Sequence, residues 1–148
     1  MSVLLGLDIL FNFMVGFILV GLIWTVQMVH YPMFIYGKGD EEFFNFHARR
    51  FALIMIPLML VEMALSVTLL FFTTLLYLKV LFWVHFIFNV VIWIESLVFQ
   101  IPDHHRVKKH FSEEHVQVLI HHNWYRTVLW TSKALLAFVI VLSSLLRS

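Results

Sequence analysis

Four stretches of this chain are apolar over a length that most soluble folds cannot accommodate. They span residues 3–33, 51–72, 75–99 and 125–146. A helix that crosses the hydrocarbon core of a bilayer needs about 20 mainly apolar residues, and each stretch meets that length. The sequence therefore predicts an all-α integral membrane protein, in which residues 1–148 form one domain and fold as an antiparallel four-helix transmembrane bundle.

The composition supports a membrane location. Hydrophobic residues make up 61% of the chain and charged residues 13%, whereas a soluble domain is about half apolar and about a quarter charged. A compact domain of this size buries only about two-thirds of its surface, so a soluble enzyme or a disordered tail is excluded. The net charge of +1 offers no basic surface for nucleic acid. The absence of cysteine excludes disulfides and thiolate metal sites.

The segments between the apolar stretches differ in length. Phe72–Leu75 is short enough to predict a tight hairpin between the second and third helices. Two longer, polar segments are predicted to be loops: residues 34–50 and 100–123. Pro102 is expected to end the third helix, because proline cannot continue the hydrogen-bond ladder. Ser112 is followed by two glutamates and predicts an N-cap, so the fourth helix is expected to begin near Glu113.

Basic residues gather in the two long segments: Lys38, Arg49, Arg50, Arg106, Lys108 and Lys109. Only Lys79 and Arg147 fall on the other side, so the long loops are expected in the cytoplasm and both ends of the chain outside. Trp24, Trp124 and Tyr125 suit an aromatic belt near the long loops. The first stretch has no basic region before it and no small-residue cleavage site after it, so we expect a helix rather than a secretory signal.

Polar residues within the apolar stretches fall on one face of each predicted helix. At about 100° per residue, Asp8, Asn12, Gln27 and His30 share one arc of the first helix. On the later helices the inward residues are His47 and Glu62; His85, Asn89, Ser96 and Gln100; and Asn123, Arg126, Thr127 and Trp130. Glu95 lies about 80° away from its neighbours' arc and is expected to face a different helix. Four converging polar stripes predict a polar interior.

Ionisable groups inside a membrane segment are costly, so each marks a candidate site. Most of the polar residues of the predicted helices lie near the long loops, and His85, Asn89, Glu95 and Glu62 lie deeper. This arrangement predicts a cavity that opens toward the cytoplasm and narrows inward.

Nine histidines make a metal ion or a haem one candidate ligand, held by His30, His47 and His104. Structural hydrogen bonds are the alternative, and histidines of the second long loop, His104 included, are expected mainly at the surface. Neither Glu62 nor Glu95 has a histidine three residues later, which disfavours a di-iron site.

Three further residues leave alternatives open. Arg126 is expected to bind lipid phosphate, to pair with Glu62 or Asp8, or to hold an anionic substrate. Lys133 needs either a partner or a path to water. His85 is expected to bond to Glu62 or Asn89, or to ligate a cofactor.

Three segments carry a family resemblance: VQMVHYPMF (26–34), FFNFHARRFALIMIPLMLVEM (43–63), and QIPDHHRV with HNWYRTVLWTSKALL (100–107 and 122–136). They resemble a family of small bacterial four-span membrane proteins of unknown function, which is distantly similar to the anthrone-oxygenase-like family. The matching positions are Gln27, His30, Tyr31, Pro32, His47, Glu62, Gln100, Pro102, His104, Asn123, Trp124, Arg126, Thr127 and Trp130. The resemblance implies the same four-helix fold, a bacterial inner-membrane location, and Tyr31 and Trp124 as additional candidate site residues.

The leading hypothesis is a ligand site at the cytoplasmic end of the bundle that binds a metal, a haem or a small hydrophobic redox substrate. If the protein is an enzyme, we expect oxidoreductase chemistry with His30 or His47 as a base or ligand. The alternative is a non-catalytic accessory subunit or assembly factor of a larger membrane complex. A small oligomeric transporter ranks third, because no repeat or broken helix is visible. The expected partners are the lipid bilayer and another membrane subunit or a second copy of the chain.

Overall fold

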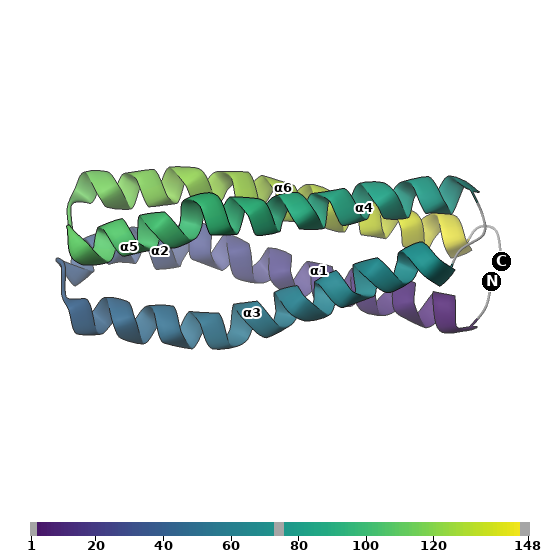
Figure 1. The fold of residues 1–148 in the computed structure, drawn as a ribbon, viewed down its shortest axis with the longest axis horizontal. Helices are drawn as coiled ribbons and strands as arrows, with labels where there is room; N and C mark the ends of the chain where they lie inside the picture. Colours follow the sequence, from purple (N-terminus) through teal and green to yellow (C-terminus); the bar gives the residue numbers. More distant parts are fainter. Residues whose placement is uncertain (1–2, 73–75, 146–148) are drawn as a thin grey trace.

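Every element of the described chain is helical. The computed structural model describes residues 3–72 and 76–145. In chain order the elements are α1 (Val3–Thr25), the π-helix η1 (Val26–His30), α2 (Tyr31–Met33), the 3₁₀-helix η2 (Phe34–Gly37), α3 (Glu41–Phe72), α4 (Leu76–Glu95), the π-helix η3 (Ser96–Gln100), α5 (Ile101–Lys109) and α6 (Glu113–Leu145). Because α1 runs on through η2 and α4 runs on through α5, the chain forms four long helical rods (Figure 1).

The four rods pack side by side as a bundle. α1 contacts α3 and α6, and α4 contacts the same two helices. The connections before α3 and before α6 lie together at one end of the bundle, which we name the link end (Figure 1, left). The starts of α1 and α4 and the ends of α3 and α6 lie at the opposite end (Figure 1).

The outer faces of the rods are apolar. Leu53, Ile87 and Leu135 are each more than half exposed, on three different rods. Four of the described helices are long and apolar enough to cross a membrane, by length and composition. Two buried apolar clusters fill the interior: one near the link end and the middle, around Leu19, Ile92 and Trp130, and one at the opposite end, around Leu5, Leu69 and Ile140. The polar side chains lie among these clusters.

The predicted loops are mostly helix, which is a correction. Residues 41–50 begin α3, and residues 100–109 and 113–123 are helical as well. Apolar patterning detects only the apolar part of a helix, and these extensions are polar or amphipathic. The predicted N-cap is confirmed, because the His115 backbone N–H donates to Ser112 Oγ at 3.1 Å. The predicted hairpin Phe72–Leu75 includes residues 73–75, which lie outside the described chain.

Pro102 does not end its helix, which is a second correction. The π-helical turn η3 precedes it, and the Ile101 N–H bonds five residues back to the Ser96 carbonyl. The same arrangement precedes Pro32, where the Tyr31 N–H bonds to the Val26 carbonyl. A proline ring clashes with the carbonyl four residues earlier in a regular helix. We attribute the continuity of both rods to these wider turns, since short π-bulges occur within α-helices and often at functional sites.

Candidate functional site

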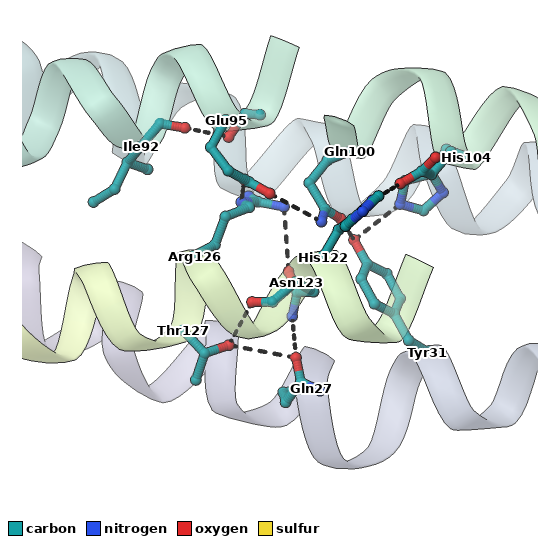
Figure 2. Close-up of polar contacts among 12 residues, drawn as sticks. Gln27, Tyr31, Ile92, Glu95, Gln100, His104, His122, Asn123, Arg126 and Thr127 are labelled. Carbon is teal, nitrogen blue, oxygen red and sulfur yellow. Dashed lines mark hydrogen bonds and ion pairs between the residues drawn. The ribbon is translucent and has the colours of Figure 1, made fainter. Parts of the chain in front are cut away.

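Side chains from three rods form a hydrogen-bonded network between the middle of the bundle and its link end (Figure 2). Gln27 of η1 is 2% exposed and lies against α6. Asn123 Nδ2 donates to Gln27 Oε1 at 2.8 Å, and Gln27 Nε2 donates to the Ile120 carbonyl at 3.2 Å. Thr127 Oγ1 donates to the Asn123 carbonyl at 3.0 Å. The π-turn thus supplies a buried amide that joins the first rod to the last.

Arg126 lies inside the bundle, next to that amide cluster. It is 6% exposed, its Nε lies 3.5 Å from Glu95 Oε2, and its NH1 donates to Asn123 Oδ1 at 3.4 Å. Its guanidinium also stacks over the Trp130 ring at 5.0 Å from the centroid. The expectation of a headgroup contact or of pairing with Glu62 or Asp8 is therefore wrong. The guanidinium is already engaged by Glu95.

Glu95 begins a chain of hydrogen bonds that runs toward the link end. It is buried and faces α6, as its angular offset predicts. Gln100 Nε2 donates to Glu95 Oε1 at 3.4 Å, and the Tyr31 hydroxyl donates to Gln100 Oε1 at 3.2 Å. The same hydroxyl lies 2.9 Å from His104 Nε2. Figure 2 shows this chain of side chains from α4, η3, α2 and α5.

The direction of these hydrogen bonds determines the tautomer of His104. A carboxylate only accepts hydrogen bonds, so the amide nitrogen of Gln100 faces Glu95 and its carbonyl faces Tyr31. The single hydroxyl hydrogen of Tyr31 is then used on Gln100. His104 Nε2 must therefore carry a hydrogen and donate it to the Tyr31 oxygen, which leaves Nδ1 of His104 as an acceptor.

Next to His104, the side chains of His30 and His47 form an aromatic site with Phe34 and Phe51. The ring centroids of His30 and His47 lie 4.9 Å apart, and the ring centroids of His47 and His104 lie 6.4 Å apart. His47 stacks on Phe51 at 5.9 Å and meets Phe34 edge-on at 4.7 Å. His47 Nε2 is buried and has no hydrogen-bond partner. We name His30, His47 and His104 the histidine cluster, and among the described residues His47 Nε2 is the only polar atom of this cluster that is buried without a partner.

The histidine cluster does not have the geometry of a metal centre. Among residues 3–72 and 76–145, no group of three histidine or carboxylate side chains is arranged to hold a metal ion. The metal set predicted from His30, His47 and His104 is brought together as neighbouring rings rather than as converging ligands. His104, expected mainly at the surface, packs instead against Tyr31 with ring centroids 5.2 Å apart.

A second buried group of polar side chains lies deeper, toward the opposite end. Lys133 Nζ and Glu62 Oε1 are 2.7 Å apart, and both side chains are 1% exposed. Trp130 Nε1 donates to Glu62 Oε2 at 3.2 Å. His85 Nδ1 lies 3.3 Å from Ser66 Oγ rather than against Glu62 or Asn89, and Asn89 Nδ2 donates to the same hydroxyl at 3.0 Å. Glu62 and Lys133 thus neutralise each other in the bundle interior.

Sequence reasoning missed Asp103 and Ser66. Asp103 is 2% exposed, pairs with Arg106 at 2.7 Å and bonds to His122 Nδ1. Asp103 falls in a segment predicted to be a loop, so the sequence does not indicate which face of a helix Asp103 occupies. Trp124, implied by the resemblance, lies on the outside and packs edge-on against Trp24 at 5.6 Å.

Comparison with known proteins leaves this geometry as the basis for function. No protein-family model, no curated protein and no solved structure matches the chain.

Proposed function

We propose that the chain is an integral membrane protein whose rods cross the bilayer as an antiparallel bundle, with the link end in the cytoplasm. The exposed apolar faces of all four rods support membrane insertion, because soluble monomers rarely expose large apolar surfaces. Six basic residues lie toward the link end, in or near the connections: Lys38, Arg49, Arg50, Arg106, Lys108 and Lys109. Basic residues favour the cytoplasmic side of a membrane.

The function we propose is the binding of a small hydrophobic molecule that carries a hydroxyl or carbonyl oxygen, at the His30–His47 site. The observation that carries it is the unpartnered His47 Nε2 within aromatic surroundings. A buried polar atom without a partner costs free energy, so such an atom in a native fold needs an explanation. A phenol or quinone oxygen supplies the missing hydrogen bond, and its ring packs on Phe51 and Phe34.

The neighbouring groups suit proton exchange with such a ligand. His104 is held in one tautomer by Tyr31, and its ring lies 6.4 Å from that of His47. Positioned imidazoles are common general acids and bases. We therefore assign His47 to direct contact with the ligand oxygen and His104 to its support.

Binding is tested with a matched pair of probes. The purified protein in lipid nanodiscs is titrated with naphthol and with naphthalene, and quenching of tryptophan fluorescence reports the dissociation constant. One hydrogen bond contributes about 1 kcal/mol, so naphthol is expected to bind about fivefold more tightly than naphthalene. His47→Phe keeps the ring and removes both nitrogens, and it is expected to abolish this preference. His121→Phe, on the exposed face of α6, is the control and keeps it.

An accessory role in a larger complex is the second candidate. The observation that favours it is the pairing of buried charges, Glu95 with Arg126 and Glu62 with Lys133, which accounts for much of the polar interior without any ligand. Equal affinity for both probes in the wild type, with an intact fold, would favour this role. Co-purification of a partner membrane subunit after mild solubilisation would then identify the complex.

A further inference from the structure

Asp8 of α1 has no role in the site described above. It lies near the start of α1, which is at the end of the bundle opposite the links (Figure 1), and it is buried, at 8% exposed. The adjacent residues Leu5 and Ile9 belong to the buried apolar cluster with Leu69 and Ile140, and Tyr77 of α4 packs against the same cluster. None of the ion pairs found in residues 3–72 and 76–145 involves Asp8. An ionised carboxylate without a cation is costly in such surroundings.

The hydrogen bonds of Thr68 give an independent indication of the state of Asp8. Thr68 Oγ1 lies 2.6 Å from Asp8 Oδ2 and 2.8 Å from the Leu65 carbonyl oxygen. A threonine hydroxyl has one hydrogen, and a carboxylate oxygen and a carbonyl oxygen are both acceptors. The two short contacts therefore contain one hydrogen too few if Asp8 is ionised. With a proton on Asp8 Oδ2, Asp8 donates to Thr68 and Thr68 donates to Leu65, so both contacts become hydrogen bonds.

Asn12 carries further buried polar atoms without a partner on the same face of α1. It lies one helical turn after Asp8 on the same buried face and is 2% exposed. Its Nδ2 and Oδ1 have no hydrogen-bond partner, and neither does Asp8 Oδ1. A water molecule needs two to four polar partners to occupy an interior position. These three atoms offer it a donor and two acceptors.

We propose that Asp8 is a proton-binding site: a neutral carboxylic acid, hydrogen-bonded to Thr68, that takes up and releases one proton through water held by Asn12. The bound proton sits on Asp8 Oδ2, and its release leaves a carboxylate that Thr68 or the water must stabilise. This site is separate from the proposed ligand site and does not depend on it.

The titratable groups that the neighbouring rods contribute to the interior of this half of the bundle are Glu62, His85, Lys133 and the partly buried Tyr77. Glu62 on α3 approaches Gly16, two turns after Asp8, and is neutralised by Lys133 on α6. His85 on α4 is held by Ser66. The Trp130 indole lies between Glu62 and Arg126. Its N–H donates a hydrogen bond to Glu62, and the indole nitrogen cannot accept a proton in exchange. The geometry thus provides a proton site without a relay to the histidine cluster.

Carbodiimide labelling tests this proposal, because dicyclohexylcarbodiimide reacts with neutral carboxylic acids in apolar surroundings and not with ionised, paired carboxylates. The full-length protein in nanodiscs is labelled, digested and analysed by mass spectrometry. Asp8 is expected to be labelled, and Glu62 and Glu95 serve as internal controls that stay at least tenfold less labelled. Labelling of Asp8 is expected to slow as the pH rises.

Two outcomes would overturn the proposal. Labelling of Asp8 no greater than that of Glu62, together with no infrared band of a neutral carboxylic acid that is lost in Asp8→Asn, would mean that Asp8 is ionised. Protection of Asp8 by sodium ions at constant pH would mean that the site holds a cation instead. Asp8→Asn provides a second measurement, since its amide can donate to Thr68 as the acid does. The folded variant is expected to lose one infrared carbonyl band of a neutral carboxylic acid, and a spectrum identical to wild type would contradict the assignment.

Discussion

Arg126 and Glu95 form an ion pair inside the bundle, with Nε and Oε2 3.5 Å apart and both side chains 7% exposed. The pair joins α6 to α4 and lies at the start of the hydrogen-bond chain that ends at His104. The Glu95 carboxylate accepts from the Gln100 amide, which sets the direction of the hydrogen bonds that follow. Removing one member of a buried pair leaves the other uncompensated, which is far more costly than removing both.

Arg126→Met is therefore expected to lower the free energy of unfolding by about 3–5 kcal/mol, and Arg126→Met with Glu95→Gln is expected to regain part of that loss. Thermal or denaturant unfolding in detergent, followed by circular dichroism, measures both. Lys108→Ala is the matched control, because Lys108 and Glu41 form an ion pair that is solvent-exposed on the glutamate side and such pairs contribute about 1 kcal/mol or less. An equal loss for the buried and the exposed pair would contradict the assignment.

Two glycines are expected to respond in opposite ways to alanine. A Cβ at Gly21 on α1 would meet nothing within 4 Å, so Gly21→Ala is expected to stabilise the helix by about 0.5–1 kcal/mol. Gly39, in the link before α3, has φ of +81°, and its Cβ would lie 3.0 Å from Phe111 Cβ. Gly39→Ala is expected to be destabilising for both reasons. The same unfolding measurement applies, and a stabilising Gly39→Ala would contradict the link geometry.

The sequence predicts which faces of the helices are buried more accurately than where the helices end. Of the four residues on the predicted arc of the first helix, Asp8, Asn12 and Gln27 are buried, whereas His30 is half-buried. The extent of the rods was missed, since α5 and the start of α6 lie in polar sequence where apolar counting gives no signal.

The pairings within the candidate site could not be predicted from helical angles. The π-turns η1 and η3 change the register after residue 25 and after residue 95, so an angle counted at 100° per residue loses accuracy there. The contact of Tyr31 with Gln100 and His104 depends on both turns. The partners of Arg126 and Lys133 depend on helix order in the bundle, which one sequence does not specify.

Tyr31→Phe is expected to release His104 from its single tautomer while leaving the bundle folded. The substitution removes the oxygen that accepts from His104 Nε2 and keeps the ring that packs on Phe34. In protein with isotope-labelled histidine, the nitrogen chemical shifts of His104 should show one tautomer in the wild type and a mixture of tautomers in the variant. Gln100→Glu is a second variant for the same measurement. It still offers an acceptor to the Tyr31 hydroxyl, but it removes the amide that donates to Glu95. A mixture in the wild type would contradict the hydrogen-bond direction inferred above.

Glu62 and Lys133 connect the stability of the interior with the state of its carboxylates. Lys133→Met is expected to cost about 3–5 kcal/mol, because it leaves Glu62 buried without its cation. Glu62 then lowers its free energy by taking up a proton, while Trp130 continues to donate to it. Glu62, which is expected to be unreactive toward carbodiimide in the wild type, should therefore become reactive in Lys133→Met. Glu62→Gln with Lys133→Met is the control, and it should lose this new label while Asp8 keeps its own. If Glu62 stays unlabelled in the folded single variant, Lys133 is not what keeps it ionised.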